Sequence, residues 1–465
     1  MTSLSDIILR GAESFPEREA VSDANTVLTY GELAERALKV AGWLTQQGVA
    51  PGERIMIVLP NGVDFVAAHF GVLFAGAVSV PCDSAASPAT LAAIRQSCRP
   101  AAMLDADTIT DALAHRQSAS DAGSGSGSDL AAILYTTGTT GDAKGVMLTH
   151  DNTLAALCNI SEFVGYTQAD REVVILPLNH SFGLGHVYCN LLNGGAVYLE
   201  PGMTRVGRIL RKIEEWGATG FPGTPLGVKL LLDRYGPVFA ERCAGLRFMV
   251  VNSAPLPPED AARLQEHLPQ CDIMVYYGLT EASRSTFASL TQLGPDFYRS
   301  VGKPMPGVDL RLSQAGEVLL SGPTVTPGYW GNPELTAEKI VEGYLHTGDL
   351  GRLDEAGNLF VTGRIGDMIN FGGYKVMPSE VEAALQSHPA VDEVCVFGEE
   401  LVEAAIVAVS GFEEQELARH CHALLEPYKV PARFHQVASI PRSNTGKVRR
   451  FELAQAVKEL ADAPA

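Results

Sequence analysis

A stretch of threonine, glycine and lysine carries the residue types of a phosphate-binding loop. It reads YTTGTTGDAKGV from position 135, and the relevant residues are Thr136, Thr137, Gly138, Thr139, Thr140, Gly141 and Lys144. Glycine lets the backbone approach a ligand closely, hydroxyls and amides donate hydrogen bonds, and an ammonium supplies positive charge. No Gly-Lys-Ser/Thr closes the stretch, so it is not a Walker A loop. We predict a site for a polyphosphate.

The segment around this loop indicates how it is held. Ile133, Leu134 and Tyr135 predict the end of a buried strand, and after the lysine the pattern up to His150 predicts the start of a helix. Before the strand, residues 117–128 are polar and rich in glycine and serine, and we expect little order there. The alternative to a ligand site is a plain turn between strand and helix.

Strand and helix patterns alternate along most of the chain. Thr29 and Glu32 fit a capping box at the head of a helix running towards Gln47, and a second helix is expected from Asn61. Buried strands are predicted at RIMIVLP, AVSVP, VVILP, AVYLE, RFMVV and IMVYY. This alternation predicts two α/β subdomains with largely parallel sheets covered by helices.

The last third of the chain changes character. After Val301, VDLRL, EVLLSG and GNLFVTGR predict a small β-rich subdomain, and from Asp367 onward helices and strands alternate again. The expected fold class is therefore α/β, with a large N-terminal domain of two α/β subdomains plus the β-rich subdomain, then a small, mobile α+β C-terminal domain. We place the N-terminal core at residues 1–364 and the C-terminal domain at residues 365–465.

Composition narrows the function classes. The chain has 465 residues, 46% of them hydrophobic, and a formal net charge of −19, which fit a multidomain globular protein and argue against nonspecific binding to nucleic acid or anionic lipid. Eight scattered cysteines without a CxxC predict neither a disulfide nor a zinc site. The N-terminus is not signal-like and no apolar run reaches about 18 residues, so we expect a cytoplasmic protein without a membrane span.

Seven motifs, taken in order, resemble those of the adenylate-forming superfamily, which includes acyl-CoA synthetases, peptide-synthetase adenylation domains and beetle luciferases. They are YTTGTTGDAKGV at 135–146, PLNHSFGLG at 177–185, YYGLTE at 276–281, GYWGNPELT at 328–336, HTGDLGRLDEAGNLFVTGR at 346–364, GGYKVMPSEVE at 372–382 and PRSNTGKVRR at 441–450. The resemblance covers nearly the whole chain. It implies two steps, in which a carboxylate attacks the α-phosphate of MgATP, pyrophosphate leaves, and a thiol then displaces AMP.

The resemblance implies a site for the nucleotide. The threonine loop and Lys144 would hold the β and γ phosphates, Glu281 would coordinate Mg2+, and the Thr280 hydroxyl would contact the α-phosphate, because attack by one anion on another needs such cations and donors. Adenine would stack on Tyr277, and the neighbouring positions assigned to the nucleotide are Asn252, Ser253, Ala254, Pro255, Tyr276 and Gly278. The first two of these stand where the family more often has glycine.

A second group of residues is implied for the ribose. Asp349, in the turn HTGD, would accept hydrogen bonds from both ribose hydroxyls, and Arg364 would reinforce that contact. Taken alone, the two residues are as typical of an ordinary turn aspartate paired with a surface arginine.

The resemblance makes Lys447 the expected catalytic residue. A lysine that reaches both the carboxylate and the α-phosphate offsets the repulsion between the two anions. Its distance in sequence from the phosphate loop implies domain closure about a hinge, where this chain has Gly366 in place of the family's charged residue. Rotation would then bring Gly372 and Gly373 towards the site and open a tunnel for the pantetheine thiol. The alternatives are a solvated basic tail for the lysine and a simple β-turn for the glycine pair.

The resemblance implies an acyl pocket drawn from the segment after Pro177 and from residues around 223–226 and 278–285. Amino-acid-activating domains usually carry an aspartate beside the position of His180, and this chain has Ser181 there. Phe182, Leu184 and Phe221 are apolar neighbours. We infer an acid without an α-amino group, of aryl or short-to-medium acyl type, and His180 either gates the thiol tunnel or packs against the substrate.

These features support an enzyme that uses ATP, Mg2+ and CoA to convert a carboxylic acid into an acyl-CoA and AMP. The first alternative is a stand-alone ligase that loads the phosphopantetheine of a carrier protein. A catalytically degenerate nucleotide-binding protein is an alternative of another class, and a luciferase-like oxidation also stays open.

Overall fold

The computed structural model describes residues 1–115, 125–137, 143–399, 401–409, 411–442 and 448–462. The chain forms two compact units, Met1–Leu310 with Leu320–His346, and Arg311–Leu319 with Thr347–Ala465. The expected mixed α/β class, with a large N-terminal part and a small C-terminal one, is confirmed. The domain boundary placed between residues 364 and 365 stays a prediction.

In the described residues of the first unit, nine strands make up the larger sheet, in the order β14-β13-β12-β11-β10-β8-β9-β1-β2. Their bounds are β1 Glu19–Ser22, β2 Val27–Thr29, β8 Arg171–Val174, β9 Ala196–Leu199, β10 Gly220–Gly223, β11 Phe248–Val251, β12 Asp272–Tyr277, β13 Thr286–Ser289 and β14 Lys303–Pro304. The strands from β12 through β9 to β1 run parallel, and β13, β14 and β2 pair antiparallel. The parallel strands are almost continuously buried, as expected when helices cover both faces.

A second sheet of the first unit has the order β5-β3-β4-β6-β7 among the described residues. Its strands are β3 Arg54–Ile57, β4 Val78–Pro81, β5 Ala102–Leu104, β6 Leu130–Thr137 and β7 Ala143–Thr149. All neighbours pair parallel except β6 and β7, which form an antiparallel hairpin at the edge.

A layer of helices lies between these two sheets. It consists of α1 Ser5–Ser14, α2 Tyr30–Gln46, α3 Val63–Phe74, α6 His150–Val164 and α7 Ser181–Leu192. Helix α3 packs on β3 and β4, helix α7 packs on β8 and β9, and α1 contacts both helices. Because α3 and α7 are covered from every side, they are apolar all round, and nearly every residue of α3 is buried.

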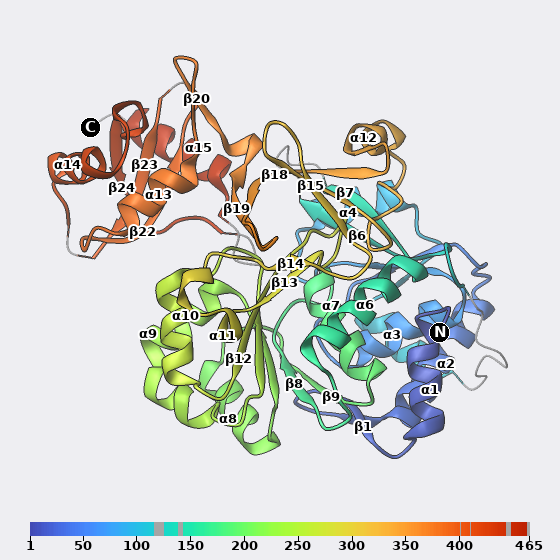
Figure 1. The fold of residues 1–465 in the computed structure, drawn as a ribbon. Coiled ribbons are helices and arrows are strands. Elements are labelled where there is room, and N and C mark those ends of the chain that lie inside the picture. Colours follow the sequence, from blue (N-terminus) through green and yellow to red (C-terminus); the bar gives the residue numbers. More distant parts are fainter. Residues whose placement is uncertain (116–124, 138–142, 400, 410, 443–447, 463–465) are drawn as a thin grey trace. The chain divides into compact units, whose positions relative to one another are not determined.

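The outer faces of the first unit carry the remaining helices. Figure 1 shows α8, α9 and α10 on the side of the nine-stranded sheet away from α6 and α7. The bounds are α4 Pro88–Cys98, α5 Ala106–Leu113, α8 Val206–Trp216, α9 Pro225–Arg242, α10 Pro258–His267, α11 Leu290–Leu293 and α12 Pro333–Lys339, with a 3-10 turn η1 at Pro295–Phe297. None of the helices in the described parts of the chain combines the length and apolar character needed to cross a bilayer.

The predicted β-rich segment forms a further sheet. Its described strands are β15 Asp309–Leu312, β16 Glu317–Ser321, β17 Ile340–Val341, β18 Tyr344–Leu353 and β19 Leu359–Arg364. They follow the order β15-β16-β18-β17, and β19 also pairs with β18.

The second unit has its own hydrophobic core, centred on apolar residues such as Val381, Ile406 and Leu417. It contains the hairpin of β20 Ile369–Phe371 and β21 Tyr374–Val376, and the sheet of β22 Val391–Phe397, β23 Glu403–Ala408 and β24 Arg433–Gln436. Its helices are α13 Pro378–Gln386, α14 Glu414–Leu424 and α15 Arg450–Asp462, with 3-10 turns η2 Ile365–Asp367 and η3 Pro427–Lys429. The helices and strands predicted after Asp367 are thus confirmed.

Most predicted elements are present, with local differences. The capping box of Thr29 and Glu32 heads α2 as expected. The second helix begins at Val63 with Gly62 as its N-cap, so the prediction of a start at Asn61 was two residues early. The prediction of a helix directly after the loop lysine was wrong. Lys144 lies in strand β7, which continues to Thr149 before helix α6 begins. The segment VMLT is rich in residues that favour strands. Helix α6 begins only after Thr149, whose hydroxyl caps its N-terminus.

Candidate active site

The predicted phosphate loop lies at the open end of the β6–β7 hairpin. Thr136 pairs with Lys144 and Thr137 with Ala143 across the hairpin. Both threonines and the lysine therefore lie at the loop end of the hairpin. Gly138, Thr139, Thr140 and Gly141 lie outside the described residues. Towards the described chain, the Lys144 ammonium makes no hydrogen bond and no ion pair. No described side chain therefore neutralises its positive charge.

A second segment runs along the outer edge of β7. The Trp330 backbone N–H donates to the Gly145 carbonyl over 2.8 Å, and the Met147 N–H donates to the Gly328 carbonyl over 3.0 Å. Between them, Tyr329 forms a bridge with Val146. The GYWGN motif is thus held beside the strand that carries the lysine, so two motifs far apart in the chain lie next to each other.

The same segment also holds Glu281. The Tyr329 hydroxyl donates to Glu281 Oε1 over 2.9 Å, and the Thr326 N–H donates to the Glu281 carbonyl over 2.7 Å. Burial raises the pKa of Tyr329, and the adjacent Glu281 carboxylate raises that pKa further, so the phenol keeps its proton and acts as a donor. Tyr329 therefore links the two predicted phosphate-binding elements of the first unit, the Lys144 strand and the Glu281 loop.

Two further predicted segments follow adjacent strands. Strands β11 and β12 are parallel with Val251 beside Val275, so residues 252–255 and 278–281 emerge at the same edge of the sheet. Crevices at the carboxyl ends of parallel strands are where such sheets bind ligands. Ser253 has φ +91°, a conformation that glycine adopts easily and serine does not, at a position where the resemblance implies glycine.

The tyrosines of the YYGLTE motif are buried at the end of β12. Tyr276 is in edge-to-face contact with Phe182, with ring centroids 5.5 Å apart, and its hydroxyl interacts with Asn252. Tyr277 is 8% exposed. The predicted stacking of adenine on Tyr277 stays a prediction.

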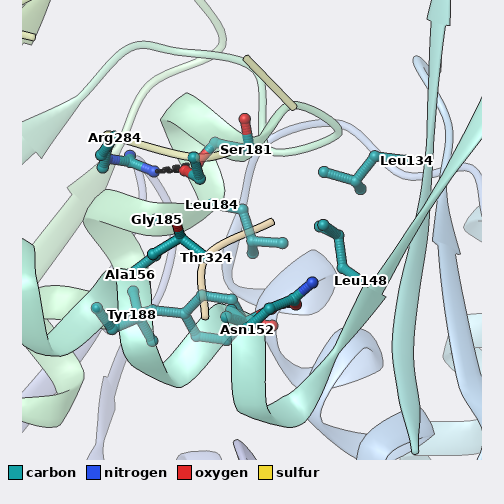
Figure 2. A pocket seen from close by; sticks show the side chains of 13 residues that line it. Leu134, Leu148, Asn152, Ala156, Ser181, Leu184, Gly185, Tyr188, Arg284 and Thr324 are labelled. Atoms are coloured by element: carbon teal, nitrogen blue, oxygen red, sulfur yellow. Dashed lines mark hydrogen bonds between the residues drawn. The ribbon is translucent and has the colours of Figure 1, made fainter. Parts of the chain in front are cut away.

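The start of α7 carries the predicted acyl-pocket residues. His180 is the N-cap residue of α7 and is half-buried, and its assigned role stays a prediction. Leu184 faces a cavity of about 40 Å3 within the first unit, whereas Phe221 is fully buried in the main core. Figure 2 shows the cavity between α6, α7 and the β6–β7 hairpin. Its lining residues are Leu134, Leu148, Asn152, Thr153, Ala156, Leu157, Ser181, Leu184, Gly185, Tyr188, Ser283, Arg284 and Thr324.

The second unit holds the residues assigned to ribose. Arg364 Nε donates to Asp349 Oδ1 over 2.6 Å, and the two residues are direct partners across β18 and β19. Asp349 lies within strand β18, so the prediction that it sits in a turn was wrong. Gly348, with φ +73°, is the turn-like residue before it. The aspartate is 5% exposed and its side chain is fixed by the arginine.

Of the other residues predicted in this unit, the structure describes Gly372 and Gly373 but not Lys447. Gly372 and Gly373 form the two-residue loop of the β20–β21 hairpin with φ of +57° and +89°, so locally they are a β-turn. Lys447 lies outside the described residues. Two of its three basic neighbours are held in the fold, because Arg442 pairs with Glu393 over 2.8 Å and Arg450 is part-buried against Glu382, whereas Arg449 is exposed.

Sequence reasoning did not single out two residues of the first unit. Tyr329 lies in a quoted motif, but its pairing with Glu281 spans 48 positions and no local pattern predicts it. Arg284 lies within the segment 278–285 predicted for the acyl pocket but was not singled out, and it lines the cavity while being 3% exposed. An arginine among small polar residues gives no sequence signal of burial.

Comparison with known proteins identifies the family. The model of the AMP-binding enzyme family matches residues 8–330, and that of its C-terminal domain matches residues 380–447. The chain belongs to the AMP-binding enzyme family. It is 31% identical to a 2-succinylbenzoate–CoA ligase of Bacillus cereus, over 99% of this chain and 100% of the relative, and 30% identical to an oxalate–CoA ligase of Arabidopsis thaliana, over 97% and 98%.

Solved structures of the family have the same fold. ATP-bound MatB from Rhodopseudomonas palustris matches with a TM-score of 0.90 and 27% identity, over 99% of this chain and 100% of that one. The o-succinylbenzoate CoA synthetase of Bacillus subtilis, bound to an acyl-adenylate, matches with a TM-score of 0.88 and 25% identity, over 97% and 98%. The resemblance read from the seven motifs is therefore confirmed. This AMP-binding enzyme is an AMP-forming acid–thiol ligase, and it uses ATP.

Proposed function

We propose that this AMP-binding enzyme activates an aryl or short-to-medium carboxylic acid lacking an α-amino group, and transfers the acyl group to CoA. In the first step, a carboxylate oxygen attacks the α-phosphorus of ATP and the bond to pyrophosphate breaks. In the second, a thiol attacks the acyl carbon, the bond to AMP breaks, and the thiol proton goes to solvent. The observation that carries the proposal is the Tyr329 link between Glu281 and the Lys144 strand.

The residues of this site fit MgATP as the substrate. Mg2+ is commonly held by one or two carboxylates together with substrate phosphates. Glu281 supplies one carboxylate, which the hydrogen bond from Tyr329 orients. No described lysine, arginine or histidine side chain lies within 4 Å of this carboxylate. When bound, the metal would neutralise charge on the phosphate oxygens.

The individual roles are those that the resemblance implies. The hairpin threonines and Lys144 bind the β and γ phosphates, and Thr280 contacts the α-phosphate, so the pyrophosphate end is stabilised as it leaves. Asp349 binds the ribose hydroxyls while Arg364 fixes its carboxylate. Lys447 then bridges the attacking carboxylate and the α-phosphate.

The acceptor thiol is assigned to CoA. The ligase relatives named above act on CoA, which supports this choice over a carrier protein. Incubation of the enzyme with ATP and an acid, with either CoA or a phosphopantetheinylated carrier protein, separates the two acceptors. Thioester formed only on the carrier protein contradicts the assignment.

The adenylation step is tested by acid-dependent exchange of labelled pyrophosphate into ATP. We expect exchange with aryl or short-to-medium acids and little with α-amino acids. Lys447→Ala is expected to abolish the exchange while calorimetry still detects ATP binding. Full exchange by that variant contradicts its catalytic role, and absence of exchange with every acid contradicts the proposed function.

A further inference from the structure

Arg284 is a buried cation at the wall of the acyl cavity. It lies in the loop between β12 and β13, three residues after Glu281, and is 3% exposed. Within the described chain, no carboxylate lies within 4 Å of its guanidinium. A charge removed from water without a counter-ion is costly, so its retention needs a reason.

The protein satisfies only part of this side chain. Arg284 Nη1 donates to the Ser181 carbonyl over 3.2 Å and to Ser283 Oγ over 2.9 Å, and Nη2 donates to the Phe182 carbonyl over 3.0 Å. A guanidinium has five N–H donors. The Nε–H and one Nη2–H therefore have no acceptor among the described residues.

The buried carboxylate of Glu172 lies on β8, against which α7 packs, and bonds to other side chains. Its Oε2 accepts hydrogen bonds from Tyr166 and Asn190, and its Oε1 lies 2.8 Å from His186 Nδ1 but accepts no hydrogen bond within the described chain. The neutral face of the Tyr276 ring lies 5.2 Å from the Arg284 guanidinium carbon and stabilises the cation without neutralising it.

The backbone and the opposite helix are both adapted to this arginine. Arg284 has φ +53°, a left-handed conformation that is uncommon for a residue with a Cβ and that clusters at functional sites. Gly185 on α7 lies directly against it, because a Cβ at that position would be 2.7 Å from the guanidinium carbon. Figure 2 shows the guanidinium directed at the turn of α7 that carries Ser181 and Gly185.

We infer that Arg284 binds a second carboxylate of the substrate, so that the acid activated is a compact dicarboxylic acid. This inference rests on the proposed function. A carboxylate would supply both the missing negative charge and the acceptors for the free N–H groups. Arg284 is three positions after Glu281, so their Cα atoms are at most about 11 Å apart. This spacing and the small cavity favour a short acid, whose reacting carboxylate points to the Glu281 end of the loop.

The test compares pairs of acids by pyrophosphate exchange with the full-length enzyme. Each dicarboxylic acid of two to six carbons is paired with the monocarboxylic acid of the same chain length. We expect kcat/KM to favour the dicarboxylic member by roughly 10- to 100-fold, the range of a hydrogen-bonded charge pair. Equal or better exchange with the monocarboxylic members overturns the inference and leaves the proposed function standing. No exchange with any acid contradicts the proposed function, and the inference falls with it.

Two variants test the residue itself. Arg284→Met should reduce the preference for the dicarboxylic acid to near one. Gly185→Ala should do so in part, because its methyl group displaces the flexible end of the arginine and not the backbone. Arg242→Met, which removes a half-exposed arginine paired with Glu214, is the control and should keep the preference. A merely structural Arg284 would lower exchange with both acids of a pair alike, and that result overturns the inference.

Discussion

The Tyr329 hydroxyl donates a 2.9 Å hydrogen bond to Glu281, and the Tyr329 backbone bridges to Val146, two residues from Lys144. The proposed metal-binding carboxylate and the proposed phosphate-binding lysine are therefore positioned by one residue. Tyr329 acts as a positioning residue, because it contacts the carboxylate and not the reacting atoms.

Tyr329→Phe tests this arrangement. The loss of a hydrogen bond to a charged acceptor is expected to lower kcat/KM for pyrophosphate exchange by about 10-fold and to raise the Mg2+ concentration needed for half-maximal rate. A titration of exchange rate against Mg2+ measures both. Tyr235→Phe, on α9, is a matched control. An unchanged Mg2+ dependence with a uniformly lower rate would mean that Tyr329 serves stability alone.

Asp349→Asn tests the ribose site of the second unit. The amide keeps the shape of the carboxylate but accepts less strongly from the ribose hydroxyls, and it leaves Arg364 without its 2.6 Å ion pair. We expect ATP to bind about 10-fold more weakly by calorimetry, and the preference for ATP over 2′-deoxy-ATP to fall towards one. A preference that survives the substitution contradicts the ribose role.

Gly366→Ala tests the proposed hinge. Gly366 is in the 3-10 turn η2, is not among the described glycines with positive φ, and a Cβ there would have nothing within 4 Å. The folded state accepts alanine, so the free energy of unfolding should rise by about 0.5 kcal/mol through the lower entropy of the unfolded chain.

If Gly366 is a hinge, the same variant slows thioester formation more than adenylation. Single-turnover kinetics of the two steps separate these effects. Equal rates for both steps in the variant and the unmodified enzyme would argue against a hinge at this position.

His69→Gln tests a source of acid sensitivity in the first unit. Burial lowers the pKa of His69 to about 3, with a smaller lowering from His150, while its ring nitrogens contact Ser79 and Tyr188. The unfolded chain binds this proton below about pH 6.5 and the folded protein does not, so stability falls as pH drops from about 6.5 towards 3.

The variant should make the stability–pH slope shallower by up to one proton between pH 6 and 4. Urea denaturation at a series of pH values measures the slope. His422→Gln, at an exposed position on α14, should leave it unchanged. An unaltered slope in His69→Gln would mean that His69 takes up no extra proton on unfolding.

Sequence reasoning located most elements because their signals are local. The Thr29 capping box and the strand through Ile133, Leu134 and Tyr135 are determined by neighbouring residues, although that strand continues to Thr137. Sequence reasoning failed where the conformation of a segment depends on pairing with a distant strand. Strand β7 forms by pairing with β6, and Asp349 is held in a strand by β19, so neither conformation could be read from a short window. Arg284, within the predicted pocket segment 278–285, was not singled out for the same reason, because its burial depends on a glycine about a hundred positions earlier.

The central claim is that the acid's carboxylate oxygen becomes bonded to the α-phosphorus of ATP. The most direct measurement supplies an acid substrate labelled with oxygen-18 in both carboxyl oxygens, together with ATP and CoA, and analyses the AMP by mass spectrometry. Because the carbon–oxygen bond breaks in the second step, the account predicts one oxygen-18 in each AMP formed. Unlabelled AMP, or label recovered in inorganic phosphate, would contradict it.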